Sequence, residues 1–409
     1  MSGILERERM CRLLIIFCVI LASEAAFPEE TDERNKFPTI MELVEANGYP
    51  LETHIAQTAD GYLLTMYRIP HGKAQETSSY IDRPVAFLQH GLLTSAADWI
   101  INGAEGLAYL LADEGYDVWM GNARGNTHSR NHIYLNPKSK AFWDFSWHEI
   151  GVFDIPAMID YTLRETGKKK LSYVGHSQGT TVLFVTLSLR PEYNAKIDIV
   201  NSLAPVAYMP NIKSPFIRYF APFVFIIDKI TSLLGMNEFA PSTPMMQLGG
   251  YFLCKDNSIF QELCANSLFL IAGFNSEQLN RTVLPLMLAF TPAGASSKQL
   301  VHYGQLFNSG KFRQFDYGWL GNLRKYGSFQ PPEYPLEAIT APIALHFSDN
   351  DWLSAVSDVQ HLQSRLRSVV GAFRVPLAAF NHLDFIFAID VKSLLYDRVI
   401  SLMNRFICP

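Results

Sequence analysis

The segment LSYVGHSQGTTVLFVTLSL, residues 171–189, decides the fold class of this 409-residue chain. Residues 171–174 predict a short strand, and residues 180–189 predict a helix directly after it. Between them, Gly175-His176-Ser177-Gln178-Gly179 matches the pattern G-x-S-x-G, in which a sharp turn from strand to helix exposes a serine hydroxyl. The segment therefore predicts a nucleophile at Ser177. The alternative is a glycine-rich turn with an idle serine.

Short strands alternate with helices on both sides of this segment. We predict strands at residues 85–88, 116–120 and 343–347 and within 373–379, and helices at 103–114 and 356–366. Residues 54–70 resemble a β-hairpin that turns at Asp60-Gly61. Because buried strands that alternate with helices pair in parallel and are covered on both faces, the sequence predicts an α/β fold with a mostly parallel central sheet.

Residues 209–330 break this alternation. They are rich in Phe, Pro, Met and Leu, and their apolar stretch 215–227 is interrupted by Arg218 and Pro222, so it does not resemble a membrane-spanning helix. We expect an inserted helical cap with a lid here, and a second packed helical layer is the alternative. The expected domains are a signal peptide at 1–25, the first part of the α/β core at 26–208, the cap and lid at 209–330, and the second part of the core at 331–409.

The N-terminus resembles a secretory signal peptide. Arg7, Arg9 and Arg12 supply positive charge, residues 13–22 form an unbroken apolar run, and small residues follow, with cleavage expected after Ala25. This apolar run is too short to span a bilayer, and an N-terminal membrane anchor is the alternative. We therefore expect a secreted protein with no transmembrane segment in the mature chain.

Secretion gives a role to the cysteines and to one glycosylation sequon. Outside the signal peptide lie Cys254, Cys264 and Cys408, and the first two are close enough in sequence to close a small loop in an oxidising compartment. Cys408 would then be free or paired between chains, whereas three buried thiols are the alternative. Asn280-Arg281-Thr282 is the sequon, and we expect a glycan on Asn280.

A serine nucleophile needs a base and an acid, which follow it in the chain in folds with this turn. His382 comes after the last predicted strand, so we predict that it takes the serine proton. Asp351 follows the strand at 343–347 and is the predicted acid that orients the imidazole. Asp349 competes for that role, because residues two apart on an extended segment share a face. His176 adjoins the serine, but the turn should aim its side chain away.

The negative charge that develops on an attacked carbonyl oxygen needs two backbone N–H donors. One donor is expected from Gln178, which follows the nucleophile, and the other from the loop after the strand at 85–88. That loop reads Gln89-His90-Gly91-Leu92-Leu93, and we assign its donor to Leu92. Gly91 would let the backbone approach a substrate closely, and His90 would shape the loop. An ordinary glycine turn is the alternative.

Charge and composition exclude several other kinds of function. The formal net charge is −5 and no long basic run occurs, so nucleic acid is not an expected partner. The sequence contains neither His-Glu-x-x-His nor a cysteine cluster with zinc spacing, so no metal and no cofactor is expected.

Together these motifs resemble the acid lipase family, which contains gastric and lysosomal lipases. The resemblance runs through nearly the whole mature chain, in Asn47-Gly48-Tyr49-Pro50, Asp60-Gly61-Tyr62, Arg68-Ile69-Pro70-His71-Gly72, His90-Gly91-Leu92-Leu93, Arg124-Gly125-Asn126-Thr127, Phe142-Trp143-Asp144-Phe145-Ser146, Gly175-His176-Ser177-Gln178-Gly179-Thr180-Thr181, Asp351-Trp352-Leu353 and His382-Leu383-Asp384-Phe385. The chain departs from many relatives at Ser348-Asp349, where two glycines are usual. This departure places a second carboxylate near the acid.

The resemblance implies an α/β-hydrolase fold and a serine lipase that hydrolyses carboxylic esters of neutral lipids, triacylglycerols or sterol esters. It implies Ser177, Asp351 and His382 as the catalytic triad and Leu92 and Gln178 as the oxyanion donors. It also implies a disulfide between Cys254 and Cys264 and a lid within residues 209–330. The destination it implies is secretion, with the lysosome as the alternative.

The inserted segment favours a lipid substrate. Its aromatic and aliphatic side chains offer apolar area that a movable lid could bury when closed and present to a lipid–water interface when open. These side chains are Phe216, Tyr219, Phe220, Phe223, Phe225, Ile226 and Ile227. Three alternatives are compatible with the same motifs: a lipid-binding carrier on an inactive hydrolase scaffold, an acyltransferase, and an esterase of short chains.

Overall fold

The computed structural model describes residues 37–74, 82–224, 226, 235, 237–243, 251, 254, 258 and 261–407. By its contacts the chain divides into two units, Met1–Phe37 and Pro38–Pro409, and the description below concerns the second unit. The predicted signal peptide, residues 1–25, and Cys408 lie outside the described residues.

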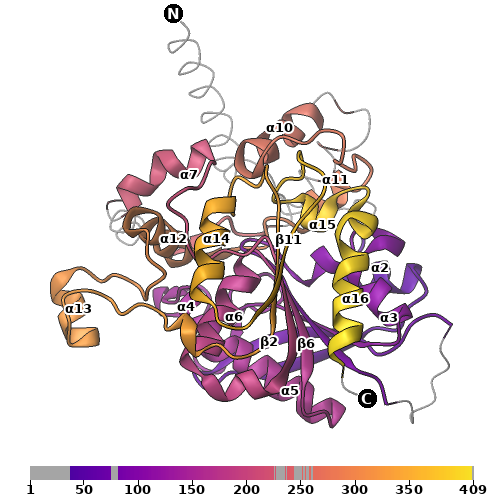
Figure 1. Cartoon of the computed structure of the whole chain (residues 1–409), viewed down its shortest axis with the longest axis horizontal. Helices are drawn as coiled ribbons and strands as arrows, with labels where there is room; N and C mark the ends of the chain where they lie inside the picture. Colours follow the sequence, from indigo (N-terminus) through magenta and orange to yellow (C-terminus); the bar gives the residue numbers. More distant parts are fainter. Residues whose placement is uncertain are drawn as a thin grey trace, which may run out of the picture. The chain divides into compact units, whose positions relative to one another are not determined.

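Within the described residues, nine strands form one central sheet (Figure 1), and their order is β1-β2-β4-β3-β6-β7-β10-β11, with β5 paired to β2. They span Glu52–Gln57 (β1), Tyr62–Ile69 (β2), Val85–Gln89 (β3), Asp117–Gly121 (β4), Asn131–His132 (β5), Leu171–His176 (β6), Ile197–Leu203 (β7), Ile343–Phe347 (β10) and Val369–Arg374 (β11). From β4 to β11 each neighbouring pair is parallel, whereas β2 pairs antiparallel with β1, β4 and β5. The expected α/β fold with a mostly parallel sheet is therefore confirmed.

Most predicted elements lie where the sequence indicated. The hairpin is β1 and β2, and the strands predicted at 85–88, 116–120, 171–174 and 343–347 are β3, β4, β6 and β10. The helices predicted at 180–189 and 356–366 are α6, Gln178–Leu189, and α14, Val356–Arg365. The helix predicted at 103–114 is divided into a 3-10 helix, Gly103–Glu105, and α3, Leu107–Asp113, because Gly106 between them is extended (φ −60°, ψ 131°).

One edge of the sheet differs from the prediction. The last strand is β11 and does not lie within 373–379, because its pairing with β10 ends where Val375 N–H donates to Phe347 O (2.9 Å), and Pro376 has no N–H to continue it. β7, between β6 and β10, was not predicted. Asn201 interrupts its apolar pattern, yet this residue is fully buried and accepts a hydrogen bond from His346 Nε2 (3.0 Å) in β10.

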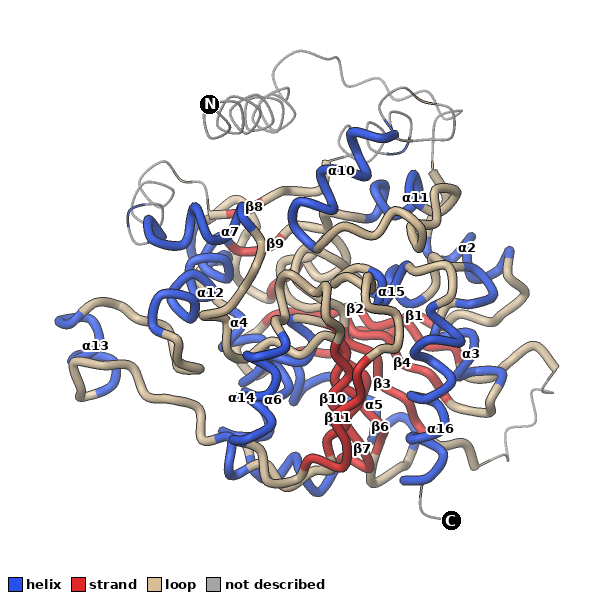
Figure 2. Tube along the Cα trace, turned by 45° about the horizontal axis from the view of Figure 1, so that its top comes forward, coloured by secondary structure: helices blue, strands red, loops and turns tan. Residues whose placement is uncertain are grey.

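Helices cover both faces of the sheet. Figures 1 and 2 show α3 and α16, Asp397–Phe406, on one side, and α4, Trp147–Glu149, with α6 and α14 on the other. On the face covered by α4, α6 and α14, a continuous core of buried apolar side chains, including Trp119, Tyr173 and Phe184, fills the space between sheet and helices. Because the parallel strands all point the same way, the loops that follow β3, β6 and β10 open at one edge of the sheet.

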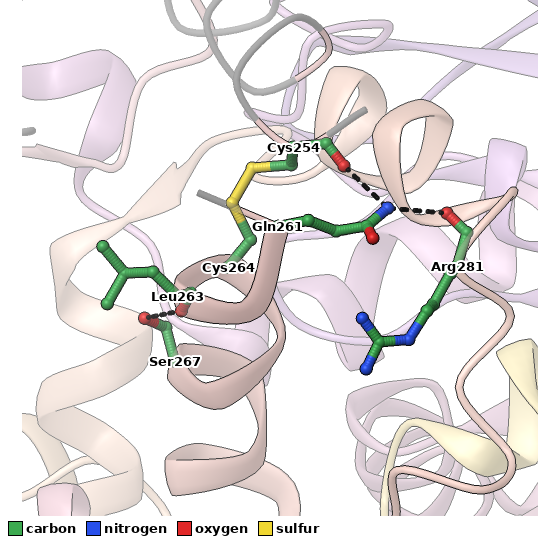
Figure 3. The surroundings of a disulfide bond; sticks show 6 residues. All are labelled: Cys254, Gln261, Leu263, Cys264, Ser267 and Arg281. Carbon is green, nitrogen blue, oxygen red and sulfur yellow. Dashed lines mark hydrogen bonds between the residues drawn. A yellow bond between two sulfur atoms is a disulfide. The ribbon is translucent and has the colours of Figure 1, made fainter. Parts of the chain in front are cut away.

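Between β7 and β10 the chain leaves the sheet. The described part of this stretch contains α7 (Pro215–Phe220), η8 (Ala221–Phe223), β8 (Glu238–Phe239), α10 (Gln261–Ala272), α11 (Leu284–Phe290), β9 (Ala295–Ser296), α12 (Ser297–Ser309) and α13 (Trp319–Tyr326). A disulfide joins Cys254 to Cys264 in α10, and Gln261 Nε2 donates to Cys254 O (3.3 Å) beside it (Figure 3). None of the helices in the described ranges has the length and apolar character needed to cross a membrane.

Candidate active site

Ser177 lies on the turn between β6 and α6. Its backbone has φ 51° and ψ −116°, a conformation that residues with a side chain rarely adopt. A Cβ atom on Gly175 would lie 2.7 Å from the Gly179 carbonyl carbon, and one on Gly179 would lie 2.2 Å from Gln89 O. The two glycines of the motif are therefore required by the close approach of strand and helix, and the strained turn exposes the serine hydroxyl.

His382 connects the serine to a carboxylate. It lies between β11 and α15, Asp384–Phe387, and its Nε2 accepts the hydroxyl of Ser177 at an Oγ–Nε2 distance of 2.8 Å. Its Nδ1 donates to the carboxylate of Asp351, at 2.8 Å from Oδ2 and 3.0 Å from Oδ1. Because a carboxylate only accepts, this geometry requires the proton on Nδ1 and leaves Nε2 able to take the serine proton. His382 and Asp351 are both buried, so water competes little for these bonds.

The two candidate acids have different surroundings. Asp351 Oδ1 also accepts the backbone N–H groups of Leu353 (2.8 Å) and Ser354 (2.7 Å), which hold the carboxylate in place. The side chain of Asp349 is 41% exposed and pairs with Arg374 Nε at 3.5 Å. The chain turns between the two residues, so they do not share a face as they would on an extended segment. Asp351 is the carboxylate that contacts His382.

His176 contacts the segment that carries the base, a contact that the sequence did not indicate. Its Nε2 donates to the backbone carbonyl of His382 (3.0 Å), and the centroids of the two rings are 5.0 Å apart. Burial, together with the nearby His382, lowers the pKa of His176 well below its usual value, so the ring that donates this bond is neutral. The G-x-S-x-G pattern allows any residue at this position, which is why the contact was not predicted.

The loop after β3 passes close to the serine. A Cβ atom on Gly91 would lie 3.3 Å from Ser177 Cβ, so a larger residue would press on the nucleophile. His90 is buried in this loop, where its Nδ1 donates to Gly91 O (2.7 Å) and its Nε2 accepts the N–H of Ala123 (3.1 Å). Burial lowers the pKa of His90 to about 4, which preserves this pair of bonds near neutral pH.

The two predicted oxyanion residues lie in the segments that meet at Ser177. Gln178 is the first residue of α6, where a backbone N–H has no carbonyl partner within the helix. Its buried side chain donates from Nε2 to Gln299 Oε1 (2.7 Å) in α12. Leu92 is partly buried, and the carbonyl of the next residue, Leu93, accepts the N–H of Ala293 (2.7 Å). The inserted segment therefore contacts both segments of the chain from which the oxyanion donors are expected.

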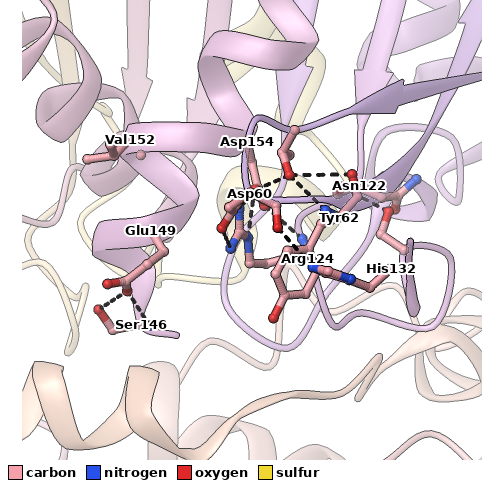
Figure 4. A network of polar contacts seen from close by, with 12 residues as sticks. Asp60, Tyr62, Asn122, Arg124, His132, Ser146, Glu149, Val152 and Asp154 are labelled. Carbon is pink, nitrogen blue, oxygen red and sulfur yellow. Dashed lines mark hydrogen bonds and ion pairs between the residues drawn. The ribbon is translucent and has the colours of Figure 1, made fainter. Parts of the chain in front are cut away.

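Arg124 forms an ion cluster with Asp60 and Asp154 (Figure 4), in which Arg124 and Asp154 are buried. Arg124 donates to both carboxylate oxygens of Asp60, at 2.6 and 2.8 Å, and from Nε to Asp154 Oδ1, at 2.7 Å. Its guanidinium carbon lies 4.0 Å from the ring centroid of Tyr62. Arg124 directly follows Ala123, whose N–H bonds to His90, so the cluster fixes one of the groups that orient that histidine.

The remaining predicted positions are distributed over the inserted segment. Asn280, in the sequon, is partly exposed, and its Oδ1 accepts the N–H of Val283 (3.3 Å). Tyr219, Phe223 and Ile226 are at least half exposed, whereas Phe225, Ile227 and the side chains of Phe216 and Phe220 lie outside the described part of the chain. Among the described residues, no group of three His, Cys, Asp or Glu side chains could hold a metal ion.

Comparison of the sequence and the structure with known proteins identifies the family of this chain. A family model described as a partial alpha/beta-hydrolase lipase region matches residues 40–103, and one described as an alpha/beta hydrolase fold matches residues 84–225. The chain is 48% identical to Lipase 3 of Drosophila melanogaster over 366 residues, which cover 89% of this chain and 92% of that protein. It is 41% identical to the gastric triacylglycerol lipase of Bos taurus over 398 residues, 96% of this chain and 98% of that protein. A solved structure from Sulfolobus solfataricus, at 12% identity and a TM-score of 0.54 over 87% of this chain and 99% of that chain, shares the fold.

Proposed function

Because this chain belongs to the acid lipase family of α/β-hydrolases and is a carboxylic ester hydrolase acting on lipid esters, we propose that it cleaves neutral lipids, triacylglycerols or sterol esters, through an acyl-enzyme on Ser177. The observation that carries this proposal is the chain of hydrogen bonds from Ser177 through the buried His382 to the buried Asp351. In this proposal these three residues form the triad, and the backbone N–H groups of Leu92 and Gln178 form the oxyanion hole.

The proposed reaction has two halves. His382 Nε2 takes the hydroxyl proton as Ser177 Oγ attacks the ester carbonyl carbon, and Asp351 stabilises the imidazolium that forms. The N–H groups of Leu92 and Gln178 stabilise the oxyanion, to which the N-terminus of α6 adds partial positive charge. His382 then protonates the departing alcohol. Water attacks the acyl-enzyme by the same steps, which releases a fatty acid and restores the serine.

We further propose that residues 209–330 form the cap and lid, and that 26–208 and 331–409 are the two parts of the core. The stretch lies between β7 and β10, and its bonds to Gln178 and Leu93 reach the loops of the site. Its exposed Tyr219, Phe223 and Ile226 supply apolar surface for contact with a lipid–water interface.

We also propose that the protein is secreted. Residues 1–25 have the charge and apolar pattern of a signal peptide, and a disulfide such as Cys254–Cys264 persists in an oxidising compartment. Expression in a secreting cell should yield a chain in the medium that begins after Ala25 and carries a glycan on Asn280. Recovery of the protein from lysosomes would assign the alternative destination.

A hydrolysis panel tests the proposed reaction and substrate. The parent protein should release fatty acid from an emulsified triacylglycerol or sterol ester faster than from a short soluble ester, because the lid responds to an interface. Ser177→Ala should lose at least about 10³-fold in kcat while unfolding at the same temperature. A fluorophosphonate probe should label the parent protein and not this variant.

Two further variants test the acid. Asp351→Asn should lower kcat by about 10⁴-fold, because the amide would favour the wrong imidazole tautomer. Asp349→Asn is the matched control and should stay within about twofold of the parent, since it removes only an exposed ion pair.

Several outcomes would contradict the proposal. They are substantial turnover by Ser177→Ala, and preference for the soluble ester with no response to an interface. Lipid binding without labelling of the parent protein would indicate a carrier. Transfer of the acyl group to an alcohol other than water would indicate an acyltransferase.

A further inference from the structure

A short stretch of the inserted segment contacts both loops that carry the acid and the base. We call residues 348–355, between β10 and α14, the acid loop, and residues 375–383, between β11 and α15, the base loop. Residues 272–275, at the end of α10, are called the strap. The carbonyl of Ala272 accepts two N–H groups, that of Trp352 (3.2 Å) in the acid loop and that of His382 (3.3 Å) in the base loop. One buried carbonyl therefore bonds to the residue after Asp351 and to the base itself.

The next two residues of the strap extend this connection. Asn381 Nδ2 donates to Gly273 O (2.9 Å), and Asn350 Nδ2 donates to both Phe274 O (2.8 Å) and Ala379 O (2.8 Å). Gly273 has φ 114°, and a Cβ atom there would lie 2.3 Å from Asn350 O. The strap thus passes between the two loops so closely that only glycine fits.

Asn275 completes the strap at Asp384, the first residue of α15. Its Nδ2 donates to Asp384 Oδ2 (2.6 Å), and the same oxygen accepts the backbone N–H of Asn381 (2.7 Å). In return, Asn381 Oδ1 accepts the N–H groups of Leu383 (2.8 Å) and Asp384 (3.0 Å). These bonds close a tight turn around His382. Asn275, Asn381 and Asp384 are at most 4% exposed, so water does not compete for the bonds.

The sheet alone does not fix the distance between acid and base. Asp351 and His382 are 31 residues apart in the sequence, and the pairing of β10 with β11 extends only to Phe347 and Arg374. Beyond that point each loop runs several residues before it reaches its functional side chain. A misplacement of about 1 Å can reduce an enzymatic rate by about 100-fold, so contacts that hold these loops together affect catalysis.

We propose that the strap holds the acid loop and the base loop at the separation that the hydrogen bond between Asp351 and His382 requires, and that Asn275, Asn381 and Asp384 are positioning residues. This inference rests on the proposed function of the triad. It adds that the inserted segment sets the geometry of the site as well as covering it. Because the strap begins at the last residue of α10, a displacement of that helix would change its bonds to both loops.

Asp384 permits a test that separates hydrogen bonding from charge. Both donors reach the same oxygen, so Asp384→Asn can keep the two bonds through its single carbonyl oxygen, whereas Asp384→Ala removes the acceptor. On a short soluble ester, Asp384→Ala should lower kcat by about tenfold to 100-fold with KM changed less than about threefold. Asp384→Asn should keep kcat within about threefold of the parent. The rate of fluorophosphonate labelling of Ser177 should follow kcat.

A second variant and a control complete the design. Asn275→Ala removes one donor and leaves Asp384 bonded to Asn381, so it should lower kcat about three- to tenfold even if Asp384→Ala does not fold. Asn308→Ala is the matched control, because Asn308 Nδ2 also bonds to a backbone carbonyl of the inserted segment, that of Ala221 (2.7 Å). The control should lower the melting temperature without changing kcat of the folded protein.

Several results would overturn the role of the strap. An unchanged kcat in folded Asn275→Ala and Asp384→Ala would do so, as would an equal loss of kcat in Asn308→Ala. If Asp384→Asn lost as much activity as Asp384→Ala, the effect would belong to the charge and not to the hydrogen bonds. Failure of the proposed function would be distinguishable, because the parent protein would then lack ester hydrolysis or Ser177→Ala would retain it.

Discussion

Asp98 and Asp384 are buried carboxyl groups in segments next to the catalytic loops, and burial raises the pKa of each to about 7. Asp384 accepts hydrogen bonds from Asn275 Nδ2 and from the backbone N–H of Asn381, and these bonds partly offset the rise in its pKa. For Asp98, in the 3-10 helix Ala96–Trp99, the hydroxyl of Thr94 offsets the burial only in part. At the scale of the residue, each carboxyl group therefore adds a dependence of stability on pH.

Replacement of Asp98 tests this dependence. The pKa of Asp98 is 3.8 in its ordinary state and about 7 in the folded protein, so between these values the folded state binds the extra proton. The stability that Asp98 contributes is therefore present at low pH and is lost as the pH rises through about 7. From pH 5 to pH 8 the loss is on the order of 3 kcal/mol, because it accrues at about 1.4 kcal/mol per pH unit up to about pH 7. Asp98→Asn cannot ionise, so its free energy of unfolding should fall less over this range.

Urea unfolding at the two pH values measures the difference. Glu45→Gln, which neutralises an exposed carboxylate on α2, Ile40–Ala46, is the control and should keep the pH dependence of the parent. If Asp98→Asn lost as much stability as the parent between pH 5 and pH 8, the carboxyl of Asp98 would not be the source of the effect.

At the scale of the element, the junction of β6 with α6 depends on close packing. Residues 178–188 of α6 are all buried, so the helix has no free side on which to move away from the sheet. Gly179 packs against the end of β3, where there is no room for a Cβ atom in place of its hydrogen atom. The position of the nucleophile is therefore tied to the packing of a whole helix.

Two glycine substitutions separate packing from backbone strain. Gly179→Ala should lower the free energy of unfolding by about 3 kcal/mol or more, or prevent folding, because the new Cβ atom would lie 2.2 Å from Gln89 O. Gly167→Ala is the control at the end of α5, Ile155–Thr166, where φ is 69° and no atom lies within 4 Å of a new Cβ atom. That substitution should cost about 1 kcal/mol from strain alone. Denaturant unfolding would refute the packing argument if both variants were equally stable.

At the scale of the whole molecule, Arg124 joins segments that are far apart in the chain. Its carboxylate partners are Asp60, in the turn of the hairpin, and Asp154, at the end of the π-helical segment Ile150–Asp154. Arg124 and Asp154 are buried, and removing one member of a buried ion pair leaves an uncompensated charge. The hairpin, the loop after β4 and the helical layer are thus coupled through one guanidinium group.

Arg124→Met should therefore lower the free energy of unfolding by about 3–5 kcal/mol. The matched control is Arg130→Met, because Arg130 pairs with Glu238 while 36% of its side chain is exposed, and such a pair contributes about 0–1 kcal/mol. Urea unfolding of both variants gives the comparison. Equally small losses would mean that the cluster is not required to hold the three segments together.

Apolar periodicity and glycine spacing made the hairpin, β3, β4, β6, β10 and α6 predictable, because both are properties of a few consecutive residues. β7 was not predicted and β11 was misplaced, because what forms these strands does not lie in a few consecutive residues. The polar residue Asn201 is buried in β7 by a partner on another strand, and β11 is a partly exposed edge strand with a weak apolar pattern. Neither feature can be inferred from neighbours in the chain.

The candidate site also has features that local sequence patterns predicted and features that they did not. The turn at Ser177 and the order of serine, acid and histidine along the chain followed from local patterns. The choice between Asp349 and Asp351 as the contact of His382, the bond from His176 to the base loop, and the passage of the strap between two loops did not. These contacts join residues that are tens to hundreds of positions apart, so they exist only where loops from separate strands and from the inserted segment meet at one edge of the sheet.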